Sequence, residues 1–161
     1  MDPSIRPYRS DDADSVVALS LDAWAPVFDS IRGALGDELF ERSSGGDWRA
    51  AQRAAVEHAL TDEATHVWVS EAEGEVAGFV AVILHGADRT GEIHMVAVAP
   101  SHQRHGHGRA LTDWATAWIK DAGMLIAMVE TGGDPGHAPA RRTYEQAGYL
   151  LLPVARYFKA L

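Results

Sequence analysis

The chain has 161 residues, 47% of them hydrophobic and 23% charged, which is the size and composition of one globular domain over residues 1–161. It contains no cysteine, so disulfides, thiolate nucleophiles and cysteine-ligated metal sites are excluded, and its formal charge of -9 disfavours a nucleic-acid partner. No apolar run approaches the roughly 18 residues of a membrane span, and residues 1–3 lack a signal-segment pattern, so we expect a cytoplasmic protein without a membrane partner.

The N-terminal part predicts one short strand followed by two helices. Residues 5–8 are extended in pattern, and Ser10, Asp11 and Asp12 can then cap a helix whose apolar residues recur at helical spacing. Residues 32–46 carry four glycines and predict a loop that encloses one or two helical turns. Asp47 can cap the second helix, which is expected to end near Thr61.

The remaining part alternates strands with helices. The expected elements are a hairpin over 66–84 that turns at Glu73-Gly74, a strand over 92–98 closed by Pro100, a helix that ends before Gly123, a strand over 125–129, a helix over 139–147 and a strand over 149–158. The predicted order is therefore βααβββαβαβ, with strands and helices in one α/β (α+β) domain.

A glycine-containing segment, Gln103-Arg104-His105-Gly106-His107-Gly108, separates the 92–98 strand from the helix that follows it. Free backbone N–H groups and the helix dipole favour an anion at this place. Gly106 and Gly108 carry no Cβ that would keep a pyrophosphate from the backbone, and Arg104 and Arg109 add positive charge. The segment therefore predicts a phosphate site.

Two other interpretations of this segment fit less well. The sequence contains no G-x-x-x-x-G-K-[ST] motif, so a P-loop is excluded. His102, His105 and His107 are candidate metal ligands, but no nearby Cys, Asp or Glu completes a coordination shell. We expect no metal.

Two motifs together are similar to the GCN5-related N-acetyltransferase (GNAT) family. Residues 103–108 resemble its acetyl-CoA pyrophosphate signature, Q/R-x-x-G-x-G/A, and residues 96–100 precede them as the family's fourth strand does. Residues 137–149 resemble the segment N-x-x-A-x-x-x-Y-x-x-x-G-F, with Ala140, Tyr144 and Gly148 in register. His137 departs from the asparagine of this pattern, and Thr143 replaces a large apolar residue. The resemblance covers roughly residues 66–160.

The resemblance implies a GNAT fold, in which about four helices flank a central, twisted, mixed and mostly antiparallel sheet of six to seven strands. It also implies an acetyl-CoA-dependent N-acetyltransferase, with no metal, that moves an acetyl group to a primary amine of a small molecule or peptide by direct attack on the thioester. In such folds the fourth and fifth strands splay apart, so that backbone groups of the fourth strand bind the pantetheine. The implied cofactor-binding residues are Val96, Ala97, Val98, Gln103, Arg104, His105, Gly106, His107, Gly108, Arg109, His137, Ala140, Arg141 and Tyr144.

The resemblance also implies catalytic roles. Tyr144, at the family's tyrosine position, would donate a proton to the departing thiolate, because a phenol with a reference pKa near 10 is neutral at pH 7. Glu92 is the first candidate for the general base, His94 the second and Glu130 the third. Strand alternation predicts one face that holds Glu92, His94, Val96 and Val98. A partly buried carboxylate with a raised pKa would suit the base.

The acceptor pocket is expected between the first helices and their connecting loop, whose apolar residues are Trp24, Phe28, Ile31, Leu35 and Phe40. The acidic residues Asp29, Asp37 and Glu38 are candidates for attracting an amine. The sequence does not choose the amine. A second interpretation is a non-catalytic acyl-CoA-binding or sensor module with the same fold. The expected strand over 150–158 is also a candidate element of a homodimer, although a monomer is compatible with the sequence.

Overall fold

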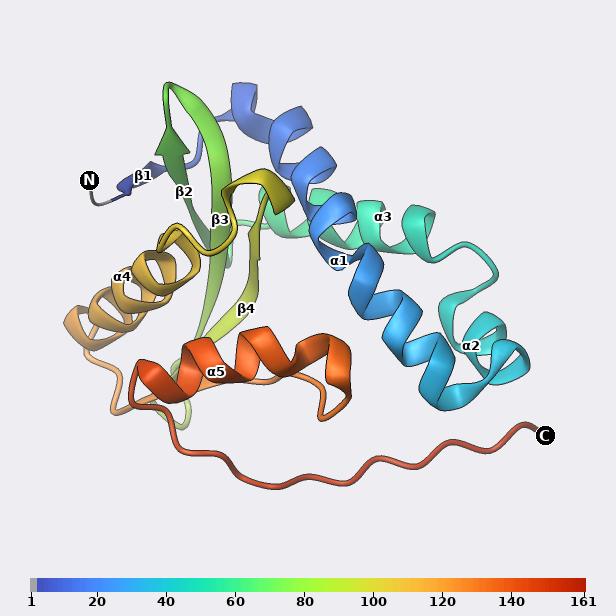
Figure 1. The fold of residues 1–161 in the computed structure, drawn as a ribbon. Coiled ribbons are helices and arrows are strands. Elements are labelled where there is room, and N and C mark those ends of the chain that lie inside the picture. The colour runs from blue at the N-terminus through green and yellow to red at the C-terminus, as the bar shows by residue number, and fades with distance from the viewer. Residues whose placement is uncertain (1–2) are drawn as a thin grey trace.

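The structure is a computed structural model that describes residues 3–161. A five-stranded sheet, in the order β1-β2-β3-β4-β5, has helices on both faces (Figure 1). The strands are β1 (Ser4–Pro7), β2 (Thr65–Ala72), β3 (Glu75–His85), β4 (Thr90–Val98) and β5 (Ile126–Val129). The first four strands pair antiparallel with their neighbours, and β5 pairs parallel with β4. The mixed, mostly antiparallel sheet is confirmed, but the prediction of six to seven strands is wrong.

The helices are α1 (Ala13–Leu35), α2 (Asp37–Ser44), α3 (Trp48–Thr61), α4 (His107–Asp121) and α5 (Ala138–Gln146). The predicted loop over 32–46 is largely helical instead: α1 continues through Gly33, and only Gly36, with φ 78°, separates it from α2. Asp47 caps α3 as predicted, because its side chain accepts a hydrogen bond from the Ala50 N–H. No helix within residues 3–161 combines the length and the hydrophobicity required to cross a membrane.

The core has two layers, one on each face of the sheet. β3 supplies both, because its successive side chains alternate between the faces: Phe79 packs with α1 and α3, and Val80 packs with α4. Both side chains are fully buried. Burial of each large apolar side chain contributes about 1.5–3 kcal/mol to folding. α4 lies so close to β4 that a Cβ at Gly91 would overlap the side chain of Ile119.

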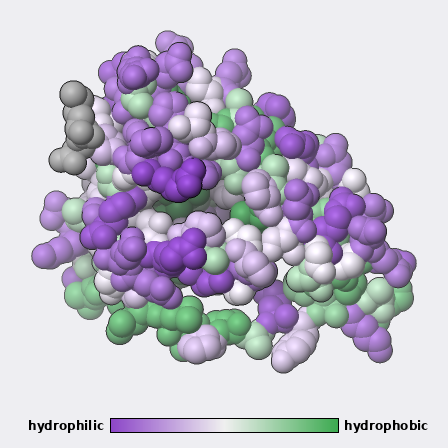
Figure 2. All heavy atoms as spheres, in the orientation of Figure 1, coloured by the Kyte–Doolittle hydropathy of each residue, from purple (hydrophilic) through white to green (hydrophobic). Residues whose placement is uncertain are grey.

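The segment over 149–158, predicted as the last strand, is not a strand. It forms an extended C-terminal tail, residues 150–161, which crosses the lower edge of the molecule (Figure 1) and lines that edge with hydrophobic side chains (Figure 2). Leu150 is 97% exposed and Tyr157 is 92% exposed. A β-prone sequence becomes a strand only when a neighbour accepts its backbone hydrogen bonds, and within residues 3–161 no strand pairs with the tail.

Candidate functional site

The unpaired edge of β4 is the centre of the candidate site. β5 runs beside only the first part of β4, and the last pair in their register is Ile93 with Val129. Residues 95–98 lie beyond this point and pair with β3 alone, so no strand of the described chain covers their other edge. Ala99 bonds to β3, and by strand alternation so does Ala97, whereas the backbone N–H groups of Val96 and Val98 face the uncovered edge and are free to bind an extended ligand.

A β-bulge at His94 changes which side chains share a face of β4. The register passes from Ala81↔Met95 to Val82↔Ile93, which leaves His94 as the extra residue. Ile93 and Val96 therefore both pack on the α4 side, and Glu92, next to Ile93, lies on the opposite face. This bulge overturns the prediction that one face holds Glu92, His94, Val96 and Val98.

The glycine-containing segment turns the chain from β4 into α4 with two residues in the left-handed conformation. Arg104 has φ 64°, and Gly106, the N-cap of α4, has φ 89°. Within the described chain, the backbone N–H groups of residues 104–109 have no backbone acceptor. A left-handed turn joined to a helix N-terminus forms a concave group of donors that suits a phosphate. Nothing lies within 4 Å of a Cβ built at Gly106, so the space there is open to a ligand.

The side chains of this segment point in different directions. Gln103 Nε2 donates to the Val98 carbonyl at 3.1 Å, while Arg104 and His105 are exposed. Arg109 binds α5 through the Gln146 carbonyl at 2.8 Å. His107 is buried, with its Nδ1 3.1 Å from Ser70 Oγ, so only its backbone faces the candidate phosphate site.

Tyr144 lies on α5 and is 8% exposed. Its ring centroid is 6.2 Å from that of Tyr149, whose hydroxyl is 2.6 Å from Thr116 Oγ1 on α4. Burial, helped by the neighbouring Tyr149, raises the pKa of Tyr144 to about 12. The phenol is therefore fully protonated at neutral pH. On the same helix Ala140 is half-buried.

Glu92 is held between two histidines. Its Oε2 is 2.7 Å from His85 Nε2, and its Oε1 is 3.4 Å from His94 Nδ1. Burial alone would raise the pKa of Glu92, but the hydrogen bonds from both histidines lower it below its ordinary value. The direction is opposite to the raised pKa expected for a base. Glu130, the third candidate, is exposed and forms an ion pair with Arg156 of the tail at 2.9 Å.

A polar cluster orders the loop between β5 and α5, and it joins His137 and Arg141, two of the predicted cofactor-binding residues, to Ser30 and Asp134, which the sequence did not indicate. His137 Nδ1 is hydrogen-bonded to Asp134 Oδ1, and Asp134 Oδ2 accepts from Ser30 Oγ of α1 at 2.6 Å. Arg141 Nη1 donates to the Asp134 carbonyl at 2.9 Å and to the Gly132 carbonyl, so its guanidinium supports the loop. Ser30 and Asp134 are far apart in sequence, and only the glycines around the aspartate mark the loop as unusual.

The aromatic residues expected to form an acceptor wall take part in packing. Phe28 stacks on Trp48 of α3, with ring centroids 4.3 Å apart, and Trp24 meets Phe79 edge to face at 6.3 Å. Phe40 is 2% exposed. Of the acidic candidates, Asp29 is exposed, Asp37 lies 3.3 Å from Arg32 and Glu38 lies 3.1 Å from Arg42.

The three histidines near the start of α4 do not converge. His107 points into the core, whereas His102 Nδ1 is 3.0 Å from the Ser101 hydroxyl and His105 is exposed. Within residues 3–161, no three His, Asp or Glu side chains come close enough together to hold a metal ion.

The arrangement suits transfer of a group from an extended, phosphate-bearing donor. The anion-binding N-terminus of α4 and the free edge of β4 are consecutive in the chain, and Gln103 links them. α4, α5 and α1 surround this edge (Figure 1), and the same face is hollowed between them, with hydrophilic residues around the rim (Figure 2). The groups that could transfer a proton are the neutral Tyr144 phenol, the Glu92 carboxylate with its two histidines, and the His137–Asp134 pair.

Comparison with known proteins gives a family match. A family model described as "Acetyltransferase (GNAT) family" matches residues 33–149. Mycothiol acetyltransferase from Streptomyces griseus is 29% identical over 119 residues, an alignment that covers 63% of this chain and 38% of that protein. The chain thus spans less than two fifths of the length of this curated relative.

Solved structures show the same fold. A mutant of the BH1408 protein from Bacillus halodurans has a TM-score of 0.73 at 15% identity and covers 98% of this chain and 99% of that chain. PaiA N-acetyltransferase from Thermoplasma acidophilum, solved in complex with coenzyme A, has a TM-score of 0.63 at 14% identity, covering 91% of this chain and 89% of that chain. At these identities the likeness concerns the fold alone.

Proposed function

The chain belongs to the acetyltransferase (GNAT) family, and from this premise we propose that it is an acetyl-CoA-dependent N-acetyltransferase that acts on a primary amine of a small molecule or peptide. The observation that carries the proposal is the group of free N–H donors at residues 104–109, which leads directly from the uncovered edge of β4. The donors would bind the pyrophosphate of acetyl-CoA, and the strand edge would bind its pantetheine arm.

The proposed reaction needs a deprotonated amine, a stabilised oxyanion and a protonated leaving group. The amine nitrogen attacks the thioester carbon, and the backbone N–H of Val96 or Val98 stabilises the resulting oxyanion. Collapse of the tetrahedral intermediate breaks the carbon–sulfur bond. Donors held on a β-strand would require no reorganisation during the step.

Tyr144 would protonate the departing thiolate. With a pKa of about 12, its phenol is a weaker acid than a cysteine-like thiol, whose reference pKa is about 8.5. A phenolate left behind would therefore be costly. We propose that Tyr144 passes on a proton, giving its own to sulfur while it takes the proton that the attacking nitrogen loses.

Glu92 and His94 lie at the point where β4 loses its β5 neighbour. Because hydrogen bonds keep the pKa of Glu92 low, its carboxylate is charged at neutral pH and would attract the acceptor ammonium next to His94. Glu92, His94 and Glu130 remain the candidates for the base among the residues that the sequence indicated.

The proposal extends to partners and location. The tail exposes Leu150, Leu151 and Leu152, and the outer edge of β5 has no neighbour within residues 3–161, so we propose a homodimer in which the tail takes part. We also propose that residues 1–161 form a single domain. The protein would act in the cytoplasm, where acetyl-CoA is available.

The test is a panel of primary amines assayed for release of free CoA thiol, beside calorimetric titration with acetyl-CoA. The panel spans aminosugars, polyamines, amino acids and short peptides. We expect micromolar to millimolar binding of acetyl-CoA and release with at least one amine. Binding without acetylation of any amine would favour the non-catalytic acyl-CoA-binding module, and absence of binding would overturn both.

A further inference from the structure

Three polar side chains from opposite parts of the sequence meet beside the candidate site. Asp134 binds His137 Nδ1 through one carboxylate oxygen and the Ser30 hydroxyl, at 2.6 Å, through the other. The Gly136 N–H donates to Ser30 Oγ at 2.9 Å, so the hydroxyl proton is left to point at the carboxylate. The side chains of His137 and Asp134 are 20% and 14% exposed.

The backbone is shaped around this cluster. A Cβ at Gly132 would overlap both the Asp134 carboxylate and the His137 ring, and a Cβ at Gly136 would lie 2.6 Å from Ser30 Cβ. Neither glycine has a positive φ, so backbone conformation does not explain them. Gly136 therefore allows the close approach of the loop to α1, and Gly132 leaves room for the Asp134 and His137 side chains within the loop.

The hydrogen bonds fix the chemical state of the imidazole. Burial alone would raise the pKa of Asp134, but hydrogen bonds from Ser30 and His137 lower it, so the carboxylate is ionised and accepts at both oxygens. A carboxylate at Nδ1 holds the proton on that nitrogen and leaves a lone pair on Nε2. Orientation of a histidine by a carboxylate in this way is what prepares the ring to act as a base.

The position of His137 suits proton transfer at the thioester. The loop starts at the end of β5, where the partner of β4 is lost, and His137 is the N-cap of α5. Tyr144 follows seven residues later, on the same helical stripe and about 10 Å along the axis. α5 thus presents an imidazole at its start and a phenol two turns further on.

We propose that His137 is the general base that takes a proton from the acceptor ammonium, and that Asp134 and Ser30 are positioning residues that hold its tautomer and orientation. The proposal rests on the proposed acetyltransferase function. Nε2 takes one proton from the ammonium and later releases it to solvent, and the freed amine attacks the thioester. The second proton lost by nitrogen balances the one that sulfur gains through Tyr144. Within the cluster the only other charged side chain is that of Arg141, which bonds to carbonyl groups of the loop.

The decisive variant is His137→Asn. Its amide nitrogen can keep the hydrogen bond that Nδ1 makes with Asp134, but it has no basic nitrogen. With an amine accepted by the wild type, we expect kcat to fall by about 100-fold or more at pH 7, since general bases contribute 10²–10⁴. The melting temperature should stay unchanged, and the Kd for acetyl-CoA should change little, because asparagine is the residue that the family pattern carries at this cofactor-binding position. Added imidazole should restore part of the rate. Unchanged kcat would overturn the assignment and return the role to Glu92 or His94.

Asp134→Asn and Ser30→Ala test the positioning roles. Both should lower kcat more than they raise KM, with the larger effect for Asp134→Asn, and imidazole should not rescue them because the ring is still present. The control is His58→Gln, an exposed histidine on α3, which should keep the wild-type rate. If these variants lose kcat only in proportion to a fall in melting temperature, and the pH profile of kcat does not move, the cluster is purely structural. That result would overturn the positioning roles.

Nitrogen-15 NMR of the histidine side chains tests the tautomer without any substrate. The signals of His137 are assigned as those missing from the spectrum of His137→Asn. We expect them to show the proton on Nδ1 in the wild type, and no preference for Nδ1 in Asp134→Asn. A proton on Nε2 would overturn the proposal. If no amine is acetylated by the wild type, the proposed function fails, whereas a normal wild-type rate with an active His137→Asn variant refutes only the base.

Discussion

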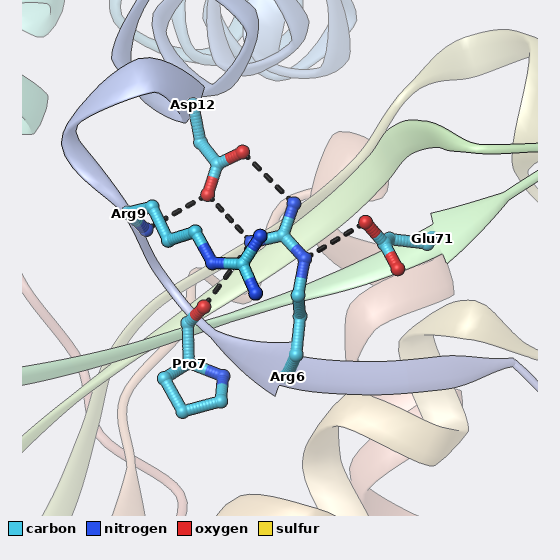
Figure 3. A network of polar contacts seen from close by, with 5 residues as sticks. All are labelled: Arg6, Pro7, Arg9, Asp12 and Glu71. Carbon is cyan, nitrogen blue, oxygen red and sulfur yellow. Dashed lines mark hydrogen bonds and ion pairs between the residues drawn. The ribbon is translucent and has the colours of Figure 1, made fainter.

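Arg6 and Asp12 form a two-point ion pair, with Nη1 2.7 Å from Oδ2 and Nη2 2.9 Å from Oδ1 (Figure 3). The Arg6 Nε donates at 2.8 Å to Glu71 of β2, and the Arg9 N–H donates at 2.8 Å to Asp12. Both members of the pair are largely shielded from solvent, at 19% and 10% side-chain exposure. The pair therefore joins β1, the start of α1 and β2 at one corner of the sheet.

This pair predicts a pH-dependent stability. The hydrogen bonds from Arg6 lower the pKa of Asp12 in the folded protein, so its contribution is complete above the unfolded pKa of about 3.9 and is lost as the pH falls through the folded pKa. We expect Asp12→Asn to lower the free energy of unfolding by about 2 kcal/mol at pH 7. Urea unfolding of both proteins from pH 7 to pH 2.5 should show the difference shrinking below about pH 4. A constant difference would contradict this role.

Substitutions of the two glycines in the phosphate segment should affect folding and acetyl-CoA binding differently. Gly108 is in ordinary helical conformation, and a Cβ there would meet only Val98 Cγ2 at 3.8 Å, so Gly108→Ala should fold normally. Its affinity for acetyl-CoA should stay close to that of the wild type, because the signature that residues 103–108 resemble accepts alanine at this position and the added methyl group is directed at Val98. Gly106→Val should lose affinity and also about 1–2 kcal/mol of stability, since a side chain at φ 89° is strained. Calorimetry with CoA and urea unfolding separate the two effects. Unchanged CoA affinity in Gly106→Val would refute the phosphate site.

Local signals in the sequence were enough to predict most of the fold. The Asp47 cap acts within three residues, and the Glu73-Gly74 turn has both residues at positive φ. Two expectations failed because they depend on distant partners. α1 passes through Gly33 because it packs against α2 and α3, and the tail has no strand beside it. Such contacts leave no short-range pattern.

The candidate site was predicted only where the chemistry is local. Segment 103–109 and the segment that contains Tyr144 are each continuous in the sequence. Their places at the start of α4 and on α5 could therefore be predicted, while their roles stay predictions. The bulge at His94 reverses which face Glu92 occupies, and no residue type marks it. The bond between Ser30 and Asp134 joins residues 104 positions apart, which strand and helix periodicity cannot indicate.

Tyr144→Phe tests the proton donor. Because burial raises the pKa of Tyr144 to about 12, its phenol keeps its proton throughout pH 6–10 and should produce no limb in that range of the pH profile. The variant should lose about 100-fold in kcat at every pH, with a profile of unchanged shape and an unchanged Kd for acetyl-CoA. Removal of a single hydroxyl leaves the ring in the core, so the melting temperature is the control for folding. An alkaline limb that disappears in Tyr144→Phe would contradict the high pKa.

The tail gives a prediction about assembly. Leu151 and Leu152, 66% and 79% exposed, would be costly to leave in water, and a second copy that covers them would remove this apolar surface from solvent. We expect the protein to sediment as a dimer at micromolar concentration, and the double change Leu151→Ser with Leu152→Ser to give a monomer of unchanged far-UV spectrum. Trp114→Gln, which removes an exposed hydrophobic side chain from α4 instead, should leave the dimer intact. A wild-type protein that sediments as a monomer would show that the tail stays open to solvent or folds onto the edge of β5 in its own chain.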